Sequence, residues 1–135
     1  MSGPRPPRVL HFDDAPMSVE PLRRAIEAAG WRIRVSERSM ALVSEVNSFQ
    51  PDMVLLDVNM PGFGGAAAAR LLSNLADSGK IKPVHIVVVS GIAEELLAKT
   101  AADVGAAGYV SKLQGAGTIV AYLSEIMRDL GVLAA

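Results

Sequence analysis

Hydrophobic residues follow two alternating patterns along this chain. Short segments rich in apolar residues predict strands over residues 9–12, 31–35, 53–57, 84–89 and 108–110, and most of them are continuous apolar runs, as in strands buried on both faces. After each run, apolar residues recur every three to four positions, which predicts helices over residues 18–29, 40–49, 66–76, 93–104 and 119–130. The pattern therefore predicts five successive strand–helix units.

The first predicted helix carries signals at both ends. Ser18 is suited to be its N-cap, Pro21 falls in its first turn, where proline is tolerated, and Gly30 stands where a helix normally stops. A glycine-rich turn at residues 61–65 precedes the alanine-rich third helix. These signals support the boundaries of the units.

The alternation of strands and helices predicts an α/β fold. Crossover helices cover both faces of a parallel sheet, so we expect a doubly wound, five-stranded parallel sheet with five helices on two faces. A length of 135 residues suits one domain. Residues 1–7 hold three of the eight prolines and no apolar periodicity, so we expect a flexible tail there and a folded domain over residues 8–135.

Composition narrows the classes of function. Charged residues are 20% of the chain and the net charge is −1, which argues against a disordered chain and against a broadly basic protein that binds nucleic acid directly. The sequence has no cysteine, which excludes thiol chemistry, and we expect its two histidines, His11 and His85, to pack within strands. No apolar run reaches the roughly 18 residues of a membrane span, and the N-terminus lacks a signal-peptide core. We therefore expect a cytoplasmic protein without membrane insertion.

Polar residues stand at the ends of four predicted strands. Asp13 and Asp14 follow the first strand, Asp57 ends the third, Ser90 follows the fourth and Lys112 lies just after the fifth. The carboxyl ends of parallel strands form the binding edge of open α/β sheets, so we expect these side chains to converge. Crowded carboxylates need a cation, and Mg²⁺ prefers oxygen ligands, while a hydroxyl and an ammonium suit a phosphoryl group.

Each of these residues also has an ordinary structural explanation. Asp13 and Asp14 could cap a turn or a helix, Ser90 could begin the next helix, and Lys112 could be a surface lysine. Four apolar residues before Asp57 also occur in the magnesium-binding strand of P-loop nucleotidases, but the sequence has no loop ending in Gly-Lys-Ser or Gly-Lys-Thr. The joint placement of all five at strand ends favours a phosphoryl site.

Four segments together resemble the receiver domains of bacterial two-component response regulators, most of all the stand-alone regulators of the chemotaxis type. They are residues 12–14 (Phe-Asp-Asp), 54–62 (Val-Leu-Leu-Asp-Val-Asn-Met-Pro-Gly), 88–91 (Val-Val-Ser-Gly) and 105–112 (Gly-Ala-Ala-Gly-Tyr-Val-Ser-Lys). The resemblance covers residues 8–130. It implies a flavodoxin-like fold with strand order 2-1-3-4-5.

The resemblance also implies roles for the residues at the strand ends. Asp57 would accept a phosphoryl group from a phosphohistidine of a sensor histidine kinase or a histidine phosphotransfer protein. Asp14 and Asp57 would bind Mg²⁺ directly, Asp13 largely through water, and the main-chain carbonyl of Asn59 would add a further ligand. Lys112 would neutralise a phosphoryl oxygen, because phosphoryl transfer needs charge neutralisation and positioning above all.

Two more residues would carry the switch in such a domain. The Ser90 hydroxyl would reach the new phosphoryl oxygens, and Tyr109 would rotate into the space that this movement opens. A downstream protein partner would bind the surface formed by the fourth helix, fifth strand and fifth helix, and the resemblance leaves a homodimer open. Tyr109 could equally be an ordinary half-exposed strand tyrosine.

One position departs from the family pattern. Proline normally follows the active-site lysine and is joined to it by a cis bond, whereas Leu113 follows Lys112 here. A cis bond before a residue other than proline costs about 2.5–4 kcal/mol, so we predict a trans bond, a rearranged loop and a differently aimed Lys112. Gly115 and Gly117 each weaken the start of the last helix by about 1 kcal/mol, which predicts looser coupling to the output surface.

Two other functions remain open at this point. The chain could be a pseudo-receiver, a protein-interaction module without effective phospho-switching, although all five strand-end residues are present. It could also be a magnesium-dependent phosphohydrolase, but Asn59 stands where such enzymes commonly carry a second acid. We therefore expect no enzyme activity beyond its own phosphorylation and dephosphorylation. The sequence ends soon after the last predicted helix, so we expect it to act through a partner, unless it is part of a longer protein.

Overall fold

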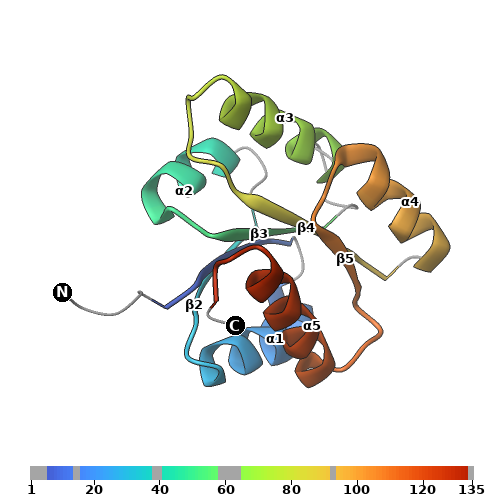
Figure 1. The fold of residues 1–135 in the computed structure, drawn as a ribbon. Coiled ribbons are helices and arrows are strands. Elements are labelled where there is room, and N and C mark those ends of the chain that lie inside the picture. Colours follow the sequence, from blue (N-terminus) through green and yellow to red (C-terminus); the bar gives the residue numbers. More distant parts are fainter. Residues whose placement is uncertain (1–5, 14–15, 38–40, 58–64, 92–93, 134–135) are drawn as a thin grey trace.

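The fold was analysed in a computed structural model, which describes residues 6–13, 16–37, 41–57, 65–91 and 94–133. Five strands and five helices alternate along this part of the chain (Figure 1). The strands are β1 (Arg8–Phe12), β2 (Arg32–Ser36), β3 (Met53–Asp57), β4 (His85–Ser90) and β5 (Gly108–Ser111). The helices are α1 (Pro16–Ala28), α2 (Leu42–Phe49), α3 (Gly65–Asp77), α4 (Glu94–Val104) and α5 (Ala116–Asp129).

The strands form one parallel sheet in the order β2-β1-β3-β4-β5. Both the predicted fold class and the strand order implied by the family resemblance are thus confirmed. In the register of the central pair, Asp57 of β3 lies beside Val89 of β4. At the neighbouring edge strand, Ser90 of β4 lies beside Ser111 of β5. The carboxyl ends of β3, β4 and β5 therefore meet at one edge of the sheet.

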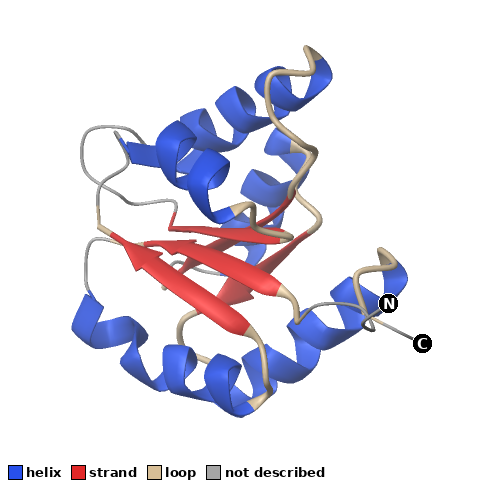
Figure 2. Ribbon diagram, turned by 90° about the vertical axis from the view of Figure 1, so that its left-hand side faces the viewer, coloured by secondary structure: helices blue, strands red, loops and turns tan. Residues whose placement is uncertain are grey.

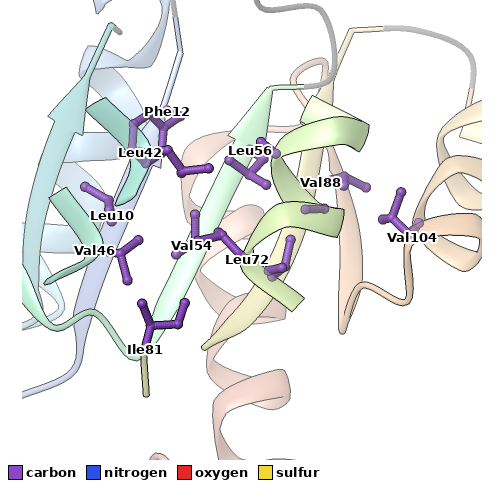
Figure 3. Packing of buried hydrophobic residues seen from close by; sticks show 14 of the residues in the cluster. Leu10, Phe12, Leu42, Val46, Val54, Leu56, Leu72, Ile81, Val88 and Val104 are labelled. Atoms are coloured by element: carbon purple, nitrogen blue, oxygen red, sulfur yellow. The ribbon is translucent and has the colours of Figure 1, made fainter. Parts of the chain in front are cut away.

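Helices cover both faces of the sheet, as Figure 2 shows. On one face, buried side chains of α2, α3 and α4 pack against alternate residues of the strands, among them Phe12, Val54 and Leu56 (Figure 3). On the other face, α1 and α5 pack against the intervening strand residues, including Leu55 and Val87. All five residues of β3 are buried, as its continuous apolar run predicted.

The start of the first helix differs from the prediction. Helix α1 begins at Pro16, so Ser18 lies inside it and the prediction of Ser18 as N-cap was wrong. Pro21 consequently stands in the second turn of the helix instead of the first. Proline suits the first position of a helix, which is where Pro16 lies. The apolar periodicity that predicted a helix over residues 18–29 did not indicate this earlier start.

The N-terminal tail is described only at its last two residues. Pro7 is buried, and its carbonyl accepts a hydrogen bond of 2.8 Å from the N–H of Arg32 in β2. Pro7 therefore already contacts the sheet. The division into a tail at residues 1–7 and a domain from residue 8 stays a prediction, since residues 1–5 lie outside the described part.

Candidate functional site

The site lies at the carboxyl edge of the sheet. Asp13 follows β1, Asp57 ends β3, Ser90 ends β4 and Lys112 follows β5 directly. Because β1 and β3 are neighbours at the centre of the sheet, their two carboxylates meet there, as the topology of a parallel sheet requires. Two further residues predicted for this site, Asp14 and Asn59, lie outside the described residues.

Lys112 joins the two carboxylates. Its Nζ lies 2.7 Å from Asp13 Oδ2 and 3.0 Å from Asp57 Oδ2, within the range of charge-assisted hydrogen bonds. Asp13 is fully buried, Asp57 is nearly so, and the Lys112 side chain keeps 28% of its surface exposed. Three strands thus contribute one charged group each to a single buried cluster.

The electrostatics of this cluster favour a charged lysine. Burial alone disfavours the ammonium, but hydrogen bonds to Asp13 and Asp57, and the attraction of both carboxylates, outweigh it, so the pKa of Lys112 is raised above its usual range. The ammonium of Lys112 is thus held by both carboxylates at once.

The chemistry of the cluster fits Mg²⁺. Both carboxylates already hold a cationic group, the Lys112 ammonium, and they offer the oxygen ligands that Mg²⁺ prefers. Among the described residues no three histidine, aspartate or glutamate side chains lie close enough together to hold a metal ion. Mg²⁺ usually takes only one or two carboxylates from a protein and keeps several waters. A buried pair of carboxylates such as Asp13 and Asp57 is therefore compatible with a magnesium site.

Ser90 and Tyr109 lie on neighbouring strands and on the same face of the sheet. Tyr109 pairs with Val88, which stands two residues before Ser90, so the side chains of Ser90 and Tyr109 leave the sheet on one side. Ser90 is fully buried, and Tyr109 is partly buried against the core of that face. The two predicted switch residues therefore share one face of the sheet. Their movement on phosphorylation stays a prediction.

The segment after Lys112 has the predicted trans bond, but the lysine side chain is not aimed away from the site. In the described segments every peptide bond is trans, including the bond between Lys112 and Leu113, as predicted. The N–H of Leu113 donates to Ser111 Oγ at 3.2 Å, and the N–H of Lys112 donates to the Ser90 carbonyl at 2.9 Å. The prediction that Lys112 would be aimed elsewhere was wrong, because its ammonium contacts Asp57.

His11 is a site neighbour to which the sequence gave no role at the site. It is buried, as predicted, and its Nε2 lies 3.7 Å from Asp13 Oδ2. Burial lowers the pKa of His11 to about 4, against the opposing effect of the Asp13 carboxylate. Alternation along β1 could have revealed this position, because residues two apart point to the same face of a strand.

Tyr122 is a second residue that the sequence did not single out. Its hydroxyl accepts a hydrogen bond of 3.4 Å from the N–H of Tyr109 in the edge strand β5. In the sequence Tyr122 is one of several apolar residues of the last helix, and nothing in that pattern distinguishes it. Only the packing of α5 beside β5 brings the two tyrosines together.

In the described part of the chain, no helix combines the length and the apolar character that crossing a membrane requires.

Comparisons with protein families and with known proteins point to the same family. The profile of the response regulator receiver domain matches residues 9–124. The DNA-binding transcriptional activator EvgA of Escherichia coli is 32% identical over 112 residues, which are 82% of this chain and 52% of EvgA. The chain spans about half the length of such relatives.

Solved structures agree with the sequence comparison. The signal receiver domain of NarL from Mycobacterium tuberculosis is 27% identical, with a TM-score of 0.74 over 90% of this chain and 96% of that one. The chemotaxis protein CheY4 of Vibrio cholerae shares the fold, with a TM-score of 0.76 over 90% of this chain and 98% of its own, at 18% identity. The chain therefore belongs to the family of response regulator receiver domains.

Proposed function

We propose that this chain is a phosphorylation switch in which Asp57 accepts a phosphoryl group from a phosphohistidine of a sensor histidine kinase or a histidine phosphotransfer protein. Family membership implies signalling that depends on phosphorylation. The observation that carries the assignment to Asp57 is its contact of 3.0 Å with the Lys112 ammonium, at the edge that also holds Asp13. The phosphodonor is inferred from the family alone.

The reaction asks little covalent chemistry of the protein. A carboxylate oxygen of Asp57 attacks phosphorus, the bond between phosphorus and the donor imidazole nitrogen breaks, and the electron pair stays on that nitrogen. Lys112 is placed to neutralise charge on the phosphoryl oxygens, because its Nζ already lies beside Asp57 Oδ2. Positioning and charge neutralisation supply most of the catalysis in such transfers.

Mg²⁺ is the proposed cofactor. Asp57 and Asp14 would bind it directly, Asp13 largely through water, and the main-chain carbonyl of Asn59 would add a further ligand. Asp14 and Asn59 belong to the family pattern and lie outside the described residues. When bound, Mg²⁺ would shield the negative charge shared by the carboxylates and the phosphoryl group. Two buried carboxylates that meet at the Lys112 ammonium, and so already hold one cationic group, support this assignment.

The proposed output passes from Ser90 to Tyr109. New phosphoryl oxygens on Asp57 would draw the Ser90 hydroxyl, and Tyr109, on the same face of the adjacent strand, would turn inward. The surface made by α4, β5 and α5 would then change for a downstream protein partner. The chain would catalyse only its own phosphorylation and dephosphorylation.

Intact mass tests the acceptor. We expect incubation with acetyl phosphate and Mg²⁺ to add one phosphoryl group to the wild-type chain and none to Asp57→Asn. Asp103→Asn is the matched control, because Asp103 is exposed on α4, away from the carboxyl edge. An adduct that persisted in Asp57→Asn would contradict the assignment of the acceptor.

The same measurement separates the switch from a pseudo-receiver. A pseudo-receiver would keep the fold and give no adduct in the wild type, with or without Mg²⁺. If acetyl phosphate modified the chain equally well in EDTA, Asp57 could still be the acceptor, but the proposed role of Mg²⁺ would be wrong. Transfer from a phosphorylated histidine phosphotransfer protein would then test the class of donor.

A further inference from the structure

A cavity of about 240 Å³ lies between β1, α1 and the start of α5. Most of its wall is apolar and includes Leu22, Val89 and Ile119, while His11 and Lys112 also line it. The cavity is therefore next to the phosphoryl site and on the α1 and α5 side of the sheet. It is smaller than the roughly 300–1,000 Å³ of typical drug-sized sites, so a single ring is the size of ligand that fits.

The wall of this cavity contains an unusual polar group. His11 is 1% exposed, and neither of its ring nitrogens has a hydrogen-bond partner among the described residues. The nearest carboxylate atom, Asp13 Oδ2, lies 3.7 Å from Nε2, beyond hydrogen-bond distance. Buried polar groups are nearly always hydrogen-bonded, so a binding partner for the imidazole is expected in the cavity.

The start of α5 adds polar character to the same wall. Gly115 is the N-cap of this 14-residue helix and makes no side-chain cap, and both Gly115 and Ala116 line the cavity. Main-chain N–H groups in the first turn of a helix that lacks a side-chain cap can donate to a ligand oxygen. A ligand oxygen that reached both groups would have to accept a hydrogen bond from a main-chain N–H at the helix start and donate one to the His11 imidazole.

Charge limits the kind of ligand. His11 is 1% exposed, and such burial favours the neutral imidazole, which offers one donor and one acceptor. An anion would lie near the buried carboxylates of Asp13 and Asp57, which repel it. A cation would lose its hydration against the apolar wall. An uncharged ligand avoids both costs.

We propose that this cavity binds a small uncharged molecule that consists of one apolar ring and one hydroxyl group. The ring packs between Leu22 and Ile119, and the hydroxyl group exchanges a hydrogen bond with the His11 imidazole. This site is additional to the phosphoryl site and does not depend on phosphorylation. A ligand bound there would contact the Lys112 side chain and would thereby affect the cluster that Lys112 forms with Asp13 and Asp57.

Binding of phenol to the full, ¹⁵N-labelled chain tests the proposal. We expect saturable shifts of amide signals at Leu22, Ala116 and Ile119, and weaker binding of toluene, which has the ring without the hydroxyl. Benzoate, which carries a charge, is expected to bind least. In His11→Val the affinity for phenol should fall up to about tenfold, since one hydrogen bond is lost, while that for toluene should not fall.

A second variant keeps the proposal testable if His11→Val is unstable. Ala116→Leu places a larger side chain at the cavity wall and should abolish binding of both phenol and toluene. The proposal is overturned if phenol gives no saturable shifts, if toluene binds the wild type as tightly as phenol, or if His11→Val leaves phenol affinity unchanged. None of these readouts uses phosphorylation, so their failure is distinct from failure of the proposed switch.

Discussion

Lys112 Nζ lies 2.7 Å from Asp13 Oδ2 and thereby ties the end of β5 to the end of β1, two strands that are not neighbours in the sheet. The same nitrogen contacts Asp57 of β3. The contact holds although Leu113, not proline, follows the lysine. The N–H groups of Lys112 and Leu113 are hydrogen-bonded to the Ser90 carbonyl of β4 and to Ser111 Oγ, so the main chain at the lysine is held without proline.

Removing the ammonium should destabilise the metal-free protein. In Lys112→Met two buried carboxylates lose the ammonium that both contact, which removes a favourable charge interaction from the core. Loss of a partner from a fully buried pair costs about 3–5 kcal/mol, and because Lys112 is partly exposed we expect about 1–3 kcal/mol. Urea unfolding in EDTA measures this change.

Mg²⁺ should reverse most of that loss. A divalent cation that binds only the folded state stabilises it in proportion to its affinity, and in Lys112→Met the carboxylates have lost the ammonium that both contact. We expect Mg²⁺ to raise the free energy of unfolding more in Lys112→Met than in the wild type. Lys99→Met, at an exposed position on α4, is the control. Equal stability of the wild type and Lys112→Met in EDTA would contradict the role given to the ammonium.

Much of the fold could be predicted because hydrophobic periodicity directly reflects burial. The run at residues 53–57 is β3 with the same bounds, and every one of its residues is buried. The start of α1 could not be placed in this way, because Pro16 begins the helix two residues before Ser18, where the sequence predicted the start. Helix ends depend on capping and on the preceding loop, which periodicity does not record.

For the site, the sequence could predict which residues lie at the carboxyl ends of the strands, but not the contacts among them. Strand ends placed Asp13, Asp57 and Lys112 at one edge, but no pattern shows that one ammonium contacts both carboxylates. The contact between Tyr109 and Tyr122 depends on how α5 packs beside the edge strand, which is a tertiary property. Contacts between elements were therefore the part that the sequence did not reveal.

Alanine at the two glycines near the start of α5 should affect the stability of the protein differently. Gly117 lies in the first turn, and a Cβ there would meet no atom within 4 Å, so Gly117→Ala should stabilise the protein by about 0.5–1 kcal/mol. Gly115 is the N-cap, where alanine is disfavoured, so Gly115→Ala should not stabilise it. Chemical unfolding measures both changes. If Gly117→Ala were neutral, glycine would not be the cause of a loose helix start.

Gly117→Ala also tests the predicted loose coupling. If a weak helix start limits transmission to the output surface, phosphorylation should shift more amide signals of α5 in Gly117→Ala than in the wild type. Spectra with acetyl phosphate and Mg²⁺ measure these shifts. Identical shifts in the two proteins would mean that the glycine does not loosen the coupling.

Stability should depend on pH through Glu20 on α1. Hydrogen bonds from Arg23, and next from Arg24, lower the pKa of Glu20 from 4.5 to about 2, although its burial acts in the opposite direction. A carboxylate with a lowered folded-state pKa stabilises the fold above its unfolded pKa, and this contribution is lost as pH falls from about 4.5 towards 2.

Glu20→Gln should therefore be less stable than the wild type at pH 6, and the difference should shrink between pH 4.5 and pH 3. Denaturant unfolding at several pH values measures the difference, and high salt should reduce it because the ion pairs lie at the surface. Glu95→Gln, at an exposed position on α4, is the control. A difference that stayed constant over this range would rule out the Glu20 carboxylate as its origin.

Gly108 of β5 should not tolerate a larger residue. A Cβ at this position would lie 2.5 Å from the Tyr122 hydroxyl oxygen and 2.8 Å from Ile126 Cδ1. Overpacking of this kind costs about 1–3 kcal/mol, so we expect Gly108→Ala to lower the free energy of unfolding by that amount. Gly91→Ala is the matched control, since a Cβ there meets no atom within 4 Å.

The Tyr122 hydroxyl should account for part of the cost of Gly108→Ala. In Tyr122→Phe the hydroxyl is gone and the nearest remaining ring atom, Cζ, lies 3.4 Å from the added Cβ. The double variant should therefore be more stable than the sum of the two single changes predicts, by about 0.5–1.5 kcal/mol, which a double-mutant cycle in urea resolves. Strict additivity would mean that Ile126, and not the hydroxyl that accepts the Tyr109 N–H, is what requires glycine at this position.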